Sequence, residues 1–121
     1  MPTNTDITIF HKELNTKNNL YEYKRIYYEF ANWQGGLGAS INKGYEQAND
    51  VNIYIPKMAN DIEDVNIYEF KIGDIICKGN VEEVITKESD LKKYTQVYNI
   101  KTIIPRDLGS DAIQHIEIGV K

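Results

Sequence analysis

Histidine, cysteine and clustered carboxylates are the residues of this chain that could do chemistry. The two histidines, His11 and His115, and the single cysteine, Cys77, stand in three separate segments. A metal centre needs several such ligands at close spacing, and a cysteine–histidine nucleophile needs a third group that orients the histidine. The local sequence supplies neither. We therefore expect no catalytic residue, no metal ligand, no cofactor and no enzymatic activity, with Cys77 a small core residue and His115 a half-exposed strand residue.

Two other segments resemble binding loops. Gln34–Gly38 is glycine-rich like a phosphate cradle, but it lacks the Lys-Ser/Thr pair of a P-loop and no helical pattern follows it. Asp61, Glu63 and Asp64 are spaced like part of a calcium loop, without the central glycine or the closing glutamate. We interpret the first as a turn after a strand and the second as a solvated acidic loop.

Aromatic residues are concentrated between Leu20 and Trp33, where four tyrosines precede the single tryptophan. Such a face could stack on single-stranded nucleic acid, which also needs a positive groove. The chain has 14 basic and 18 acidic residues, a net charge of -4, which argues against that groove. Tyrosine and tryptophan are also enriched at protein–protein interfaces, so we favour an assembly surface.

The elements that must position these residues are strands. Alternating or β-branched and aromatic segments predict them at 6–10, 20–33, 51–55, 75–77, 96–104 and 113–120, with a possible extension over 81–85. An asparagine-rich turn spans 15–19, one helical turn is expected at 89–94, and a long excursion covers about 57–70. The predicted fold class is mainly β: a small antiparallel β-barrel or sandwich of six to seven strands with long loops and at most one short helix.

Length and composition fit one domain over residues 1–121. One cysteine excludes an intrachain disulfide scaffold. There is no apolar run of about 18 residues, so we expect no membrane span.

Several short segments together resemble an uncharacterised family of structural proteins from tailed phages and prophages of low-GC Gram-positive bacteria. The resemblance rests on Asp6–Phe10, Tyr23–Trp33, Val51–Pro56, Lys71–Gly79, Ser89–Leu91 and Gln114–Gly119. It covers nearly the whole chain through short patterns. The resemblance implies the small β-barrel of head–tail joining proteins of the stopper type, which sit beneath the portal-adaptor ring.

That resemblance implies a virion protein assembled in the host cytoplasm as a homo-oligomeric ring. Its partners would be connector or portal-adaptor proteins and tail proteins, with passive contact with packaged DNA along the excursion and no membrane contact. The interface residues we expect lie on the aromatic strand and on the excursion: Tyr23, Tyr27, Trp33, Lys57, Met58 and Tyr68. Two alternatives remain open, namely a tail or baseplate component and a small ligand- or oligosaccharide-binding β-barrel that uses Trp33 and the tyrosines.

Overall fold

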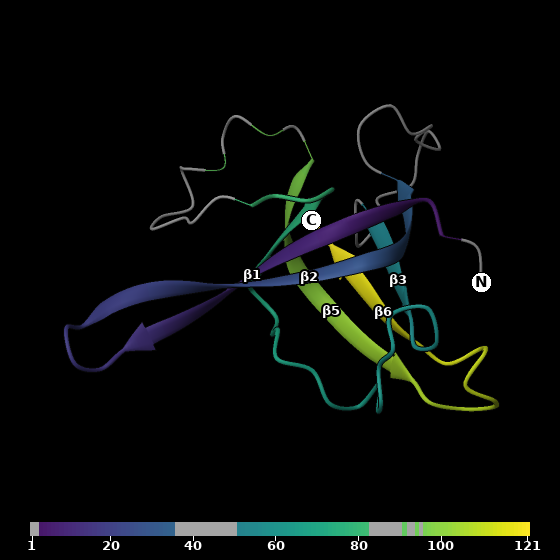
Figure 1. The fold of residues 1–121 in the computed structure, drawn as a ribbon. Helices are drawn as coiled ribbons and strands as arrows, with labels where there is room; N and C mark the ends of the chain where they lie inside the picture. Colours follow the sequence, from purple (N-terminus) through teal and green to yellow (C-terminus); the bar gives the residue numbers. More distant parts are fainter. Residues whose placement is uncertain (1–2, 36–50, 83–90, 92–93, 95) are drawn as a thin grey trace.

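The computed structural model describes residues 3–35, 51–82, 91, 94 and 96–121, and its described part is built from six β-strands (Figure 1). They are β1 (Thr5–Asn15), β2 (Leu20–Gly35), β3 (Val51–Pro56), β4 (Ile75–Lys78), β5 (Val97–Arg106) and β6 (His115–Val120). All neighbours are antiparallel and close in the order β1-β2-β3-β6-β5-β4. The predicted small antiparallel barrel is confirmed.

Two long strands, β2 and β5, each serve both halves of the barrel. The first part of β2 pairs with β1, and Asn32–Gly35 pairs with β3. Likewise, β5 pairs with β4 over Val97–Asn99 and with β6 over Ile100–Arg106. Each strand changes partner midway, so each part of the strand has a described β-strand neighbour on one side only.

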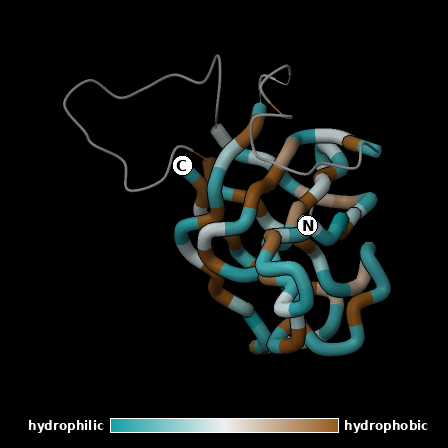
Figure 2. The backbone as a smooth tube through the Cα atoms, turned by 90° about the vertical axis from the view of Figure 1, so that its left-hand side faces the viewer, coloured by the Kyte–Doolittle hydropathy of each residue, from teal (hydrophilic) through white to brown (hydrophobic). Residues whose placement is uncertain are grey.

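The barrel core follows the alternation of the sequence. Val51, Ile53 and Ile55 of β3 are fully buried, and their register partners on β6 are Val120, Ile118 and Ile116. Figure 2 shows the same pattern of hydrophobic residues interspersed with hydrophilic ones in the barrel body. Period-2 alternation therefore directs one face of each strand inward.

A second, smaller cluster lies on the outer face of β1 and β4. Phe10 pairs with Ile75 on the side opposite Ile9 and Ile76, and it packs with Cys77, Val81 and Leu91. The chain after β4 is tied across this face by Thr8, whose Oγ1 donates to Gly79 O at 2.8 Å and accepts from Val81 N at 2.9 Å. Cys77 is a buried core residue, as predicted.

The excursion between β3 and β4, residues 57–74, is here called the plug segment. The sequence predicts a long excursion between strands at about 57–70, and the structure shows that part of it packs into the core. Val65 and Phe70 are fully buried in the main core. The segment bridges β2 and β5: the Asn60 side chain bonds both backbone groups of Phe30, and Ile100 exchanges backbone bonds with Gly73 and Asp74. The plug segment therefore lies between β2 and β5, where the two strands are not paired with each other.

The ends of some strands also differ from the ranges predicted from the sequence. The first strand extends to Asn15 rather than Phe10, because residues 11–15 pair with residues 20–24 of β2. Pro105 and Arg106 belong to β5 rather than to a loop, since both pair with β6. Val81 and Glu82 are not in a strand. Most of the predicted helical turn, Gly36–Gly38 and 83–85 lie outside the described residues.

In the part of the chain that the structure describes, no helix is long and apolar enough to cross a membrane.

Candidate assembly surfaces

The most prominent surface feature is the hairpin arm, formed by residues 11–15 of β1 and 20–25 of β2. β4 pairs with β1 no further than Phe10, so the arm extends past the barrel as two strands (Figure 1). Its turn is closed by asparagine: Asn19 adopts φ 57, a left-handed conformation that asparagine tolerates, and the side chains of Asn15 and Asn18 accept from Lys17 N and Leu20 N.

Large apolar side chains are exposed at the end of this arm. Leu14 and Tyr21 are cross-strand partners and are 51% and 55% exposed, and Leu20 is 63% exposed. The Lys12 ammonium lies 4.2 Å from the centre of the Tyr21 ring. Two-stranded hairpins are marginally stable alone in water. An apolar arm tip of this kind is suited to contact with another molecule.

A buried histidine–aspartate pair joins the base of the arm to the plug segment. His11 Nδ1 donates to Asp74 Oδ2 at 2.7 Å, and its Nε2 lies 3.2 Å from a Glu13 carboxylate oxygen. Asp74 also accepts from Lys71 N at 2.6 Å and Lys12 N at 3.2 Å. Among the described residues, no serine, threonine or cysteine is hydrogen-bonded to His11. This geometry makes Asp74 a clamp between two segments.

A second tie lies nearby on the same hairpin. Lys24 forms an ion pair with Glu69, and this hydrogen bond raises the pKa of Lys24. Together with Asp74, this pair fixes the last part of the plug segment to the arm. The base of the arm is therefore held against the last part of the plug segment by the His11–Asp74 and Lys24–Glu69 contacts.

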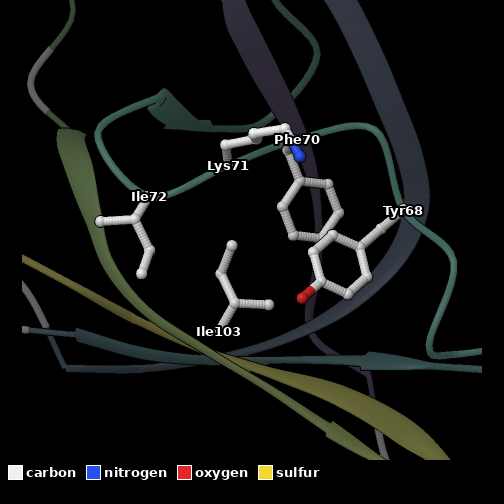
Figure 3. A pocket seen from close by; sticks show the side chains of 5 residues that line it. All are labelled: Tyr68, Phe70, Lys71, Ile72 and Ile103. Atoms are coloured by element: carbon white, nitrogen blue, oxygen red, sulfur yellow. The ribbon is translucent and has the colours of Figure 1, made fainter.

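An open hollow of about 380 Å³ lies between the plug segment and β5. Its lining is Tyr68, Phe70, Lys71, Ile72 and Ile103. The Tyr68 and Phe70 rings stack at 4.9 Å, and Figure 3 shows them opposite Ile72, with Ile103 between. The hollow is an apolar recess with a cation, Lys71, in its lining.

A third apolar surface lies where the plug segment meets the β5–β6 loop. Lys57 Nζ donates to Asp111 at 2.8 Å, and Asn66 donates to Asp107 at 3.0 Å. Around these ties, Met58, Ile67, Leu108 and Ile113 are each at least 60% exposed. Asp61, Glu63 and Asp64 are exposed as well, as the solvated-loop interpretation predicts.

The residues predicted for an interface are dispersed by the structure. Trp33 is 4% exposed and packs against Tyr98, so its side chain belongs to the core; the expectation that it lies on an accessible face is wrong. Its Nε1 has no hydrogen-bond partner among the described residues. Tyr23 is half-buried against the outer cluster.

The other four predicted residues are accessible to different degrees. Tyr27 is 36% exposed, and its hydroxyl donates to Asp6 at 2.7 Å, which raises the pKa of Tyr27. Met58 is 66% exposed, whereas Lys57 is held by Asp111 and Tyr68 lines the hollow. Of the six, only Lys57 and Met58 are neighbours, and they share the surface of the plug segment.

Leu14, Leu20 and Tyr21 of the arm tip are not among the interface residues expected from the sequence. Leu14 and Leu20 flank an asparagine-rich turn, and both are apolar where a hairpin end is normally polar. That contrast was the available signal. Ile103 is half-buried: it packs on the core and also lines the hollow.

In the described part of the chain, no group of three or more His, Cys, Asp or Glu residues could hold a metal ion. The described part of the barrel carries three apolar surface features: the arm tip, the hollow and the surface around the β5–β6 loop. Fold and surfaces together define a small six-stranded antiparallel barrel with a projecting hairpin arm.

The chain belongs to a family of unknown function, DUF6751, whose model matches residues 2–121. Comparison with curated proteins gave no match, and comparison with solved structures gave none either.

Proposed function

We propose that this protein is a structural subunit of a phage virion, a stopper-like head-completion protein that forms a homo-oligomeric ring at the head–tail interface. The sequence resemblance supplies the setting. The observation that carries the assembly role is the hairpin arm, which extends beyond the barrel with Leu14, Leu20 and Tyr21 exposed.

The electrostatics of the chain suit this setting. A net charge of -4 leaves the surface without a strong general attraction for DNA. Within a ring, such a subunit lets DNA pass without being held. The plug segment is packed into the barrel, so any contact with DNA comes from its exposed side chains and not from a free loop.

The alternative of an oligosaccharide-binding barrel loses its main residue, because Trp33 is buried and offers no stacking face. A tail or baseplate position uses the same contact surfaces, and the location of the chain in the particle distinguishes it from the head–tail interface.

Two measurements test the proposal. Light scattering across a concentration series, with negative-stain images of the large species, should show closed rings. Mass spectrometry and antibody labelling of virions induced from the encoding bacterium should place the chain at the head–tail junction. Labelling at the distal tail would favour the baseplate alternative, and absence of the chain from purified virions would refute a virion role.

A triple variant of the arm tip, Leu14→Ser with Leu20→Ser and Tyr21→Ser, should abolish the rings while the monomer stays folded. Leu108→Ser is the matched control, because Leu108 is 84% exposed and lies on the β5–β6 loop away from the arm. Rings that survive the triple variant would show that the arm does not carry assembly.

A further inference from the structure

Two segments at one end of the barrel are held together as a single surface, here called the loop surface. It consists of residues 57–67 of the plug segment and residues 106–114, which connect β5 to β6. Lys57 ties the two segments, because its backbone N donates to Gln114 O at 2.9 Å and its Nζ donates to Asp111 at 2.8 Å. The arm leaves the barrel on a different side (Figure 1). The loop surface and the arm are therefore separate places for contact with another molecule.

The apolar side chains of the loop surface are exposed on a fixed base. Val65 is fully buried and Ile62 packs against the main core, which anchors the plug half. In the other half, the Ile113 side chain lies so close to Gly109 that a Cβ at Gly109 would collide with it. Exposed apolar side chains on a preformed backbone mark an interaction site, since little conformational freedom is lost on binding. They are Met58, Ile67, Leu108 and Ile113, each at least 60% exposed.

The charge around these apolar side chains is negative. The loop surface contains five acidic and two basic residues. Of the basic residues, Lys57 forms an ion pair with Asp111. Arg106 forms an ion pair with Glu117 of β6. The remaining four carboxylates are exposed and form no ion pair with a described residue, so the loop surface attracts a cationic partner. They belong to Asp61, Glu63, Asp64 and Asp107.

This negative charge decides between occupants of the loop surface. Nucleic acid and anionic lipid are themselves negative and would be repelled. The arm of a second copy is apolar and has four basic against two acidic residues over 11–25. Three of those four cations, however, already contact a carboxylate, a backbone carbonyl or an aromatic ring of their own chain. They are Lys24, Arg25 and Lys12.

We infer that the loop surface binds a segment of a different protein that presents lysine or arginine side chains next to apolar ones. The apolar side chains of that segment cover the exposed apolar side chains of the loop surface, while its cations meet the four unpaired carboxylates. This contact goes beyond the proposed ring and does not depend on it, because the ring contact is assigned to the arm. The two surfaces together allow one subunit to bind two different neighbours at once.

A synthetic peptide tests the chemistry of the loop surface. The probe is a short fluorescein-labelled peptide in which lysine and leucine alternate, and its binding to the full chain is followed by fluorescence anisotropy. Two matched peptides carry glutamate in place of lysine or serine in place of leucine. Only the lysine–leucine peptide should bind tightly, and added salt should weaken its binding because charge–charge attraction is screened. In an NMR titration, the chemical-shift changes should be concentrated in 57–67 and 106–114.

Charge substitutions locate the peptide on the chain. Asp61→Asn with Glu63→Gln removes two carboxylates and should weaken peptide binding about three- to tenfold. Asparagine also tolerates the left-handed backbone of Asp61, whose φ is 54. The matched control, Glu22→Gln with Glu29→Gln, removes the same charge from exposed positions of β2. This control should change the affinity by less than about twofold, because its carboxylates lie outside the loop surface.

The apolar part of the contact has its own pair of variants. Met58→Ser removes an exposed apolar side chain from the loop surface and should weaken peptide binding about three- to tenfold. Ile72→Ser is the matched control, since Ile72 lies on the same plug segment but outside the loop surface, and both side chains are 66% exposed. It should change the affinity by less than about twofold.

The outcomes separate this inference from the proposed function. Equal binding of the glutamate–leucine peptide, or equal weakening by the two charge variants, would show that the loop surface does not select a cationic partner. Equal effects of Met58→Ser and Ile72→Ser would place the peptide elsewhere and overturn the inference. Loss of rings in Met58→Ser protein would make the occupant a second copy rather than a different protein. A chain that binds the peptide as expected but forms no rings would refute the ring and leave this inference standing.

Discussion

Phe70→Ala is the sharpest test of the conclusion that the plug segment is part of the core. Phe70 is fully buried, its ring stacks on Tyr68 at 4.9 Å and it meets Tyr28 edge-on at 6.1 Å. A phenylalanine-to-alanine change in a packed core costs about 3–5 kcal/mol, since apolar burial is lost and a cavity remains. That is a large part of the roughly 5–15 kcal/mol by which a domain is stable.

Urea unfolding followed by tryptophan fluorescence measures this loss. Trp33 is the single tryptophan and is buried in the same core cluster as Phe70, so its emission reports core exposure. With a denaturant slope of about 1.5 kcal/mol per M, the midpoint should fall by about 2–3 M. Circular dichroism should give the same midpoint if unfolding is two-state.

The matched control is Ile72→Ala, two residues further along the same segment. Ile72 is 66% exposed, so its truncation should change the free energy of unfolding by no more than about 0.5 kcal/mol. Equal and small effects of both variants would refute the reasoning, because they would mean that residues 57–74 form a detached loop. Deletion of the whole segment is a poor test, since it also removes core residues.

Three further predictions concern stability and reactivity. Cys77 should react with a thiol reagent only as fast as the chain opens, because burial raises its pKa to about 12; rapid stoichiometric labelling in native buffer would contradict this. Burial also raises the pKa of Tyr28 to about 12, from 10.0. The unfolded chain releases that proton at lower pH than the folded chain, so the contribution of Tyr28 is complete below pH 10 and is lost as pH rises toward 12. The expected loss is about 3 kcal/mol by urea titration, and Tyr28→Phe should reduce it. Finally, Asp74→Ala removes the acceptor of His11 and of two backbone amides and should cost about 3 kcal/mol, against a negligible effect of the exposed Glu63→Ala; similar thermal midpoints for the two variants would show that the clamp contributes little.

Part of the fold could be predicted because the information is local. The alternation in Val51–Ile55 and Ile116–Val120 directs these side chains inward whatever their partners are. The asparagine-rich 15–19 segment marks the hairpin turn because asparagine tolerates the left-handed backbone that Asn19 adopts. Composition alone excludes an intrachain disulfide framework, because the chain has one cysteine.

The functional surfaces depended on which segments meet in space. Trp33 reads as an interface residue beside four tyrosines, but pairing with β3 and packing on Tyr98 place it inside. Phe70 and Val65 stand in an acidic, poorly periodic segment, so no local pattern marks them as core residues. The arm exists because β4 is shorter than β1, which is a property of the pairing rather than of either strand.

The sequence by itself thus determined the strands, their inward faces and the mainly β class, because backbone propensity and side-chain alternation act over a few residues. Tertiary structure alone decided that the excursion packs Val65 and Phe70 into the core and that His11 meets Asp74 across 63 residues. It also decided that Leu14, Leu20 and Tyr21 stand beyond the core. Burial depends on contacts between residues far apart in the chain, and spacing within one segment does not specify those contacts.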